Sequence, residues 1–144
     1  MPTSVLPGPV ILCLARAYGA AQGFQVEALE ALLDDAERTL AVGGDEPYEP
    51  SLGPPQGDSV LANVPAGIAF LRASLARLRG DAALAAGYNQ QAVAHLAEDE
   101  RLMRSFVRWN QAGVHWLDGR LGPAERGLAE VLAGLRAPTK RSAA

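Results

Sequence analysis

The side chains that could carry metal or acid–base chemistry in this sequence are two histidines and their acidic neighbours. His95 lies three residues before Glu98, and His115 lies three residues before Asp118. A metal site in a helical bundle needs Glu-x-x-His pairs on two helices, and the sequence contains neither that pair nor an HExxH motif. We therefore expect no metal site and no metal cofactor.

Nucleophilic and nucleotide chemistry also lack candidate residues. The single cysteine, Cys13, lies among aliphatic residues without a CxxC partner, which indicates a buried thiol in a reducing, cytoplasmic setting. No GxSxG, GxGxxG or GxxxxGK[ST] motif is present. The tripeptide Arg79-Gly80-Asp81 spells an adhesion motif, but it falls at an expected helix turn. We expect a protein that is not an enzyme and uses no cofactor.

Charge and hydropathy argue against two kinds of partner. The chain has 144 residues, a formal net charge of −3 and a sequence pI of about 5.3, so it lacks the cationic surplus that nucleic-acid binding demands. The apolar stretch 5–14 is about half as long as a membrane span, and no Lys or Arg precedes it. We expect a cytoplasmic domain without direct nucleic-acid contact, a membrane segment or a targeting signal.

Segments rich in alanine and leucine must position any functional residues. Both residue types lose little side-chain freedom in a helix, and runs of β-branched residues are absent, which predicts an all-α fold. Between residues 43 and 59, four prolines and four glycines predict a long loop, which we interpret as an insertion. The six helices predicted from spacing and Gly or Pro breaks span residues 9–22, 25–41, 65–79, 82–97, 99–117 and 123–135.

Together these helices predict three antiparallel hairpins in a single domain, 1–144. The hairpins span about 9–42, 60–97 and 99–136, with a tail over 137–144. When the turn glycines Gly23, Gly80 and Gly119 are aligned, an alanine stands five residues after each of them. Because two helices approach closely only where side chains are short, the aligned alanines indicate a repeated, closely packed hairpin. The fold that we expect is a tetratricopeptide-like array with right-handed stacking. The first hairpin matches worst, with Arg16 and Asp35 where small residues fit.

Two segments, Phe70–Leu96 and Phe106–Leu132, carry a resemblance to a known family. An LRA-x-LA helix is followed by a Gly-Asp turn, an Ala-rich helix, the acidic break Glu98-Asp99-Glu100 and a second hairpin. Over residues 10–136 this pattern resembles the helical-repeat region of MalT-like, LuxR-type bacterial transcription regulators. The resemblance implies a sensor or scaffold domain that binds an inducer or a regulatory protein. The chain would be a piece excised from such a regulator, with the nucleotide-binding switch and the helix-turn-helix elsewhere.

The resemblance also implies a binding surface. In tetratricopeptide arrays the first helix of each hairpin lines a concave groove, at positions ten and three residues before the turn glycine. In this chain the positions are Cys13, Ala20, Phe70, Arg77, Trp109 and Trp116. Since Trp and Arg are enriched at binding hot spots, we expect the last four to bind a protein or a small-molecule effector. The alternative is that the two tryptophans pack on a following repeat.

The preferred interpretation is therefore a non-catalytic binding scaffold from a transcription regulator, whose partners include the remaining domains of that regulator. A free-standing helical-repeat adaptor with no link to transcription is one alternative. A structural helical domain that pairs with itself through its apolar faces is another. The flanking reading frame distinguishes the first two, and light scattering detects the third.

Overall fold

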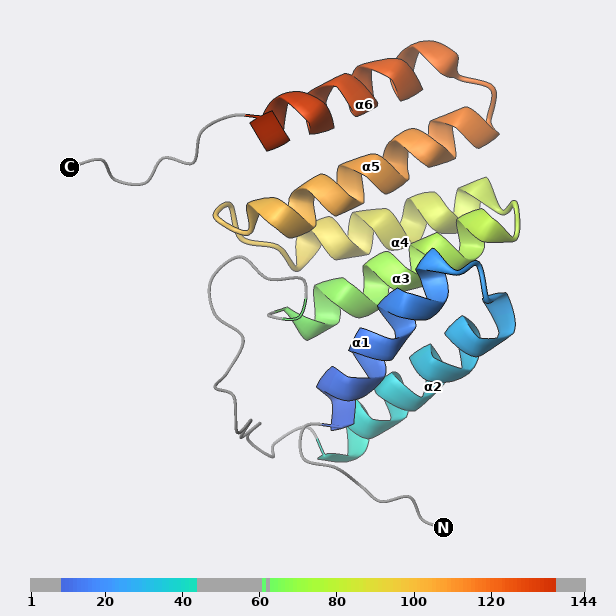
Figure 1. The fold of residues 1–144 in the computed structure, drawn as a ribbon, viewed down its shortest axis with the longest axis vertical. Helices are drawn as coiled ribbons and strands as arrows, with labels where there is room; N and C mark the ends of the chain where they lie inside the picture. The colour runs from blue at the N-terminus through green and yellow to red at the C-terminus, as the bar shows by residue number, and fades with distance from the viewer. Residues whose placement is uncertain (1–8, 44–60, 62, 137–144) are drawn as a thin grey trace, which may run out of the picture.

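Six α-helices make up the part of the chain that the structure describes, a computed structural model covering residues 9–43, 61 and 63–136 (Figure 1). They are α1 (Pro9–Gln22), α2 (Val26–Gly43), α3 (Val64–Leu78), α4 (Ala82–Ala94), α5 (Arg101–Leu117) and α6 (Leu121–Arg136). Within these ranges there is no strand, which confirms the all-α prediction. None of the described helices is both long and apolar enough to cross a membrane. The predicted loop after Gly43 and the predicted tail lie outside the described residues.

Consecutive helices run antiparallel and pack in pairs, α1 with α2, α3 with α4 and α5 with α6 (Figure 1). α3 lies at the centre, because it also contacts α1, α2 and α5, and ten of its 15 residues are buried. Small residues permit this packing: a Cβ on Gly67 of α3 would lie 3.1 Å from Leu14 of α1. Among the described helices, α6 contacts only α5.

One hydrogen-bond pattern recurs at the turn within each pair. A backbone N–H just after the turn donates to a carbonyl five residues earlier, at 2.8–2.9 Å. The donor and acceptor pairs are Gln25 and Ala20, Asp81 and Ala76, and Arg120 and His115. The residue before each donor has a positive φ, 57° at Phe24, 81° at Gly80 and 75° at Gly119. All three turns therefore end their first helix with the same Schellman cap.

The first turn corrects the alignment made from sequence, since its left-handed residue is Phe24 and not Gly23. Counted from Phe24, Ala17 stands seven residues before the turn and Ala36 twelve after it, and both are fully buried. The mismatches at Arg16 and Asp35 therefore came from an alignment that was one residue out of register at this turn. The cause is physical: glycine normally occupies the left-handed position, because any side chain there costs about 1–2 kcal/mol.

The apolar core lies between the first two helix pairs and extends to α5, and an ion-paired edge closes it on one side. Leu14, Leu33 and Leu71 are among its fully buried side chains. At the edge, Arg72 of α3 donates to two carboxylates of α2, at 2.8 Å to Asp34 and 2.6 Å to Glu37. These contacts hold the first pair of helices against the second.

Four helix ends differ from their predicted positions by two residues or more. α2 ends at Gly43 instead of 41, α4 ends at Ala94 instead of 97, α5 begins at Arg101 instead of 99, and α6 begins at Leu121 instead of 123. Between α4 and α5, Arg104 donates to the carbonyls of Leu96 at 3.1 Å and Ala97 at 2.9 Å. These bonds satisfy backbone groups outside a helix, so the connection is longer than the local sequence indicates.

Candidate functional site

Two adjoining hollows lie along the first helix of each pair, and they share Arg77 and Trp109. The inner hollow, of about 370 Å³, lies between α1, α3 and α5. Its aromatic lining consists of Tyr18, Phe24, Phe70, Phe106 and Trp109. A volume of this size falls at the small end of the range for ligand pockets, and its lining is mainly apolar, as in most such pockets.

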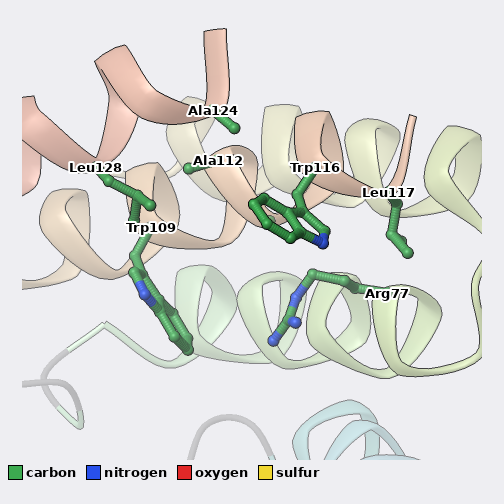
Figure 2. Close-up of a pocket in the computed structure, with 8 residues that line it drawn as sticks. Arg77, Trp109, Ala112, Trp116, Leu117, Ala124 and Leu128 are labelled. Carbon is green, nitrogen blue, oxygen red and sulfur yellow. The ribbon is translucent and has the colours of Figure 1, made fainter. Parts of the chain in front are cut away.

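The outer hollow, of about 260 Å³, lies between α3, α5 and α6. Figure 2 shows Arg77 extending from α3 below the ring of Trp116, with its guanidinium on the side of Trp109, and Ala124 and Leu128 of α6 beyond the tryptophans. Trp109 is 51% exposed and Trp116 is 66% exposed. The inner and outer hollows lie on either side of Arg77 and Trp109, and we call the two together the tryptophan groove.

Arg77 is held in the groove by contacts with α5. A Cβ on Gly113 would lie only 2.8 Å from Cδ of Arg77, so the arginine stem occupies space that only a glycine leaves. The guanidinium carbon lies 5.4 Å from the centroid of the Trp109 ring, within range of a cation–π interaction. Burial lowers the pKa of Arg77 from its usual value. The arginine is therefore a positioned, partly desolvated cation.

The charge of Arg77 has no described counterpart. Its Nε atom is buried without a hydrogen-bond partner in the described part of the chain, and none of the described ion pairs includes this residue. No Asp or Glu lines either hollow. The groove therefore presents one cation among apolar and aromatic surfaces.

The structure brings the four predicted site residues to one groove but at different depths. Arg77, Trp109 and Trp116 line the outer hollow together, while Phe70 lines the inner hollow. Phe70 is only 5% exposed, and its ring centroid lies 6.1 Å from Tyr18 and 5.8 Å from Phe106. Phe70 thus forms part of the wall, and the exposed surface belongs to the tryptophans. Their role in binding stays a prediction.

Sequence reasoning missed three aromatic residues of the inner hollow, Tyr18, Phe24 and Phe106. Tyr18 donates to Sδ of Met103 at 3.5 Å, and burial raises the pKa of its phenol. Phe24 is 70% exposed at the rim. If residue 24 instead of Gly23 had been aligned with Gly80 and Gly119, Phe24 would have stood out as the one turn residue that is not a glycine.

The other residues singled out for chemistry lie elsewhere. His95 is exposed at the end of α4, where its carbonyl accepts a 2.7 Å hydrogen bond from Asn63. His115 lines a separate hollow with Arg108 and Arg126. Cys13 is partly buried, and its pKa is raised by burial and by the charge of Asp35. Among the described residues, no three His, Cys, Asp or Glu side chains are grouped as metal ligands would be.

Comparisons with known proteins add nothing to this geometry. No family model matches the chain, and neither a curated protein nor a solved structure was found to be similar to it.

Proposed function

We propose that this chain is a non-catalytic scaffold that binds a protein or effector partner in the tryptophan groove. The observation that carries the proposal is the pair of tryptophans, each more than half exposed, beside an arginine that belongs to none of the described ion pairs. Trp and Arg combine a large apolar area with a polar group, which is why they dominate binding hot spots. A partner would cover the rings and supply a negative charge for the guanidinium of Arg77.

The architecture that we propose for the scaffold is a tetratricopeptide-like array with right-handed stacking. Two observations support it. The three turns share one Schellman hydrogen-bond pattern, with its left-handed residue at Phe24, Gly80 and Gly119. Buried alanines also stand at equal distances from these residues, as Ala17 and Ala73 do seven positions before their turns. In such an array the first helices of the pairs form the concave face, and here α1, α3 and α5 supply most of the residues that line the groove.

The resemblance to MalT-like, LuxR-type transcription regulators suggests the context of the binding event. There the domain would sense an effector or a regulatory protein for a longer polypeptide. A free-standing adaptor would use the same groove without that link. The reading frame that flanks the coding sequence distinguishes the two, since a regulator would continue into a nucleotide-binding or helix-turn-helix segment.

Selection from a phage-displayed library of random 12-residue peptides tests whether the groove binds. Any enriched peptide is then titrated against the purified chain while tryptophan fluorescence is recorded, because both tryptophans of the chain line the groove. We expect Trp109→Ala and Trp116→Ala each to weaken binding about ten-fold or more, as hot-spot truncations do. Leu84→Ala is the control, since Leu84 is exposed on α4 and lines neither hollow. Equal affinities for all variants would refute the proposal.

Self-association is a second candidate function, favoured by the surface of α6. Leu121, Leu128 and Leu132 are exposed at spacings of seven and four residues, which places them on one stripe of a helix that contacts only α5 among the described helices. Light scattering at increasing protein concentration measures the mass directly. A dimer that Leu132→Asp dissociates would support self-association, and a monomer throughout would exclude it.

A further inference from the structure

The charges around the tryptophan groove define what its partner must carry. Arg72 and Arg79 pair with carboxylates of α2, and Arg104 donates to two backbone carbonyls. Arg77 is partly buried but belongs to none of the described ion pairs, and its guanidinium lies over the face of the Trp109 ring. A guanidinium that is partly desolvated gains most from a carboxylate, which can accept two parallel hydrogen bonds. The groove is therefore complementary to an anion.

The shape of the groove indicates which apolar groups the partner must carry beside its anion. The inner hollow lies on one side of the Arg77–Trp109 pair, and the outer hollow lies on the other. Both are lined mainly by apolar and aromatic side chains, so each suits a bulky apolar group.

We propose that the groove recognises an extended peptide segment in which one Asp or Glu stands between two bulky apolar residues. The carboxylate would accept hydrogen bonds from Arg77, and the two apolar side chains would fill the inner and outer hollows. A small acid would fill one hollow only, whereas a segment fills both. This inference rests on the proposed binding function and specifies the chemistry of the partner.

The conformation and exposure of Phe24 indicate that the inner hollow binds part of the partner. Its backbone is in the left-handed region, where the other two turns have glycine, and its ring remains 70% exposed at the rim of the hollow. A strained residue that gains little burial in the folded chain is typical of a functional contact. The ring of Phe24 would cover the apolar side chain of the bound segment.

The test uses the peptides enriched by the unmodified chain and needs no folded variant for its first result. We expect the enriched sequences to share an acidic residue flanked by apolar ones. Changing that Glu to Gln, or Asp to Asn, in a synthetic copy should weaken binding ten- to hundred-fold, as loss of a charge-assisted hydrogen bond does. Enriched peptides without an acid, or an unchanged affinity of the amide analogue, would overturn the inference.

Arg77→Gln then identifies the partner of the carboxylate. It should bind the acidic peptide and its amide analogue with similar affinity, whereas the unmodified chain discriminates between them. Circular dichroism checks that the variant remains helical. Continued discrimination by Arg77→Gln would place the carboxylate elsewhere and refute the assignment. Arg108→Gln is the matched control, because Arg108 is an exposed arginine of α5 outside the groove.

Two further outcomes separate other occupants. If N-acetyltryptophan, which offers one ring and one carboxylate, competes as strongly as the peptide, the site takes small acids and the segment proposal fails. If peptides bind with no acid preference while Trp109→Ala still abolishes binding, the scaffold function stands and only this inference falls. If neither tryptophan contributes, both proposals fail.

Discussion

Replacement of the turn glycine Gly80 by alanine should destabilise the fold through backbone conformation alone. Its φ of 81° lies in the left-handed region, which costs an alanine about 1–2 kcal/mol. Alanine also restricts the unfolded chain, which returns about 0.4–1 kcal/mol. No atom lies within 4 Å of the added Cβ, so no steric cost is added. The expected net loss is about 0.5–1 kcal/mol, with a similar loss for Gly119→Ala.

Gly87 on α4 provides a control of opposite sign. It is exposed, its Cβ position is also free of neighbours, and its φ is not positive, so Gly87→Ala should stabilise the helix by about 0.5–1 kcal/mol. Urea unfolding followed by circular dichroism at 222 nm measures both changes. If Gly80→Ala is as stable as Gly87→Ala, the assignment of the turn as a left-handed cap is wrong.

At Phe24 the left-handed position holds a side chain, so here a change to glycine should relieve the backbone strain. Phe24→Gly and Phe24→Ala both remove the ring, but only glycine relieves the positive φ. The glycine variant should therefore be more stable than the alanine variant by about 0.5–1 kcal/mol in the same urea experiment. An alanine variant equal to or more stable than the glycine variant would contradict the corrected position of the first turn.

Two further predictions concern electrostatics. Burial raises the pKa of Tyr18, so the phenol of the folded chain keeps a proton that the unfolded chain releases near pH 10. The free energy of unfolding should therefore be unaffected by this group below pH 10 and should fall as the pH rises above 10, by up to about 1.4 kcal/mol per pH unit. Urea midpoints between pH 8 and 11 should fall less in Tyr18→Phe, and an equal fall would refute this cause. Arg72→Met should cost about 1 kcal/mol at low salt and less in 1 M NaCl, because it breaks the contacts to Asp34 and Glu37. Arg38→Met, which breaks an exposed pair within α2, should change the urea midpoint much less, and equal losses would contradict a special role for Arg72.

The helices were predictable because their signals are local. Alanine and leucine spacing, with Gly and Pro at the ends, indicated all six helices to within a few residues. The connection between α4 and α5 was not predictable in this way. There Glu100 accepts from the N–H of Ala97 at 2.8 Å and from the side chain of Asn63, the residue before α3, at 3.0 Å. Asn63 is distant in sequence, so no local pattern could indicate where α4 ends and α5 begins.

Part of the candidate site was also predictable. Trp109 and Trp116 share a face of α5 because seven residues make nearly two helical turns, and α3 carries Arg77 at the corresponding position. The depth of each residue was not predictable. Phe70 is buried because Tyr18 of α1 and Phe106 of α5 cover its ring, and which helices cover a residue depends on tertiary packing.

Two consecutive buried hydrogen bonds, the first from α5 to α3 and the second within α3, explain why Arg77 lies beside Trp109. Asn110 of α5 is fully buried and donates to Oγ of Ser74 on α3 at 2.7 Å, and Ser74 donates to the carbonyl of Phe70 at 3.1 Å. Leaving a buried amide donor unpaired costs about 1–3 kcal/mol, so sliding α5 along α3 is unfavourable. Trp109 directly precedes Asn110, and Arg77 follows Ser74 by one turn of helix. The hydrogen bond that sets the register of the two helices therefore also places the arginine against the tryptophan ring.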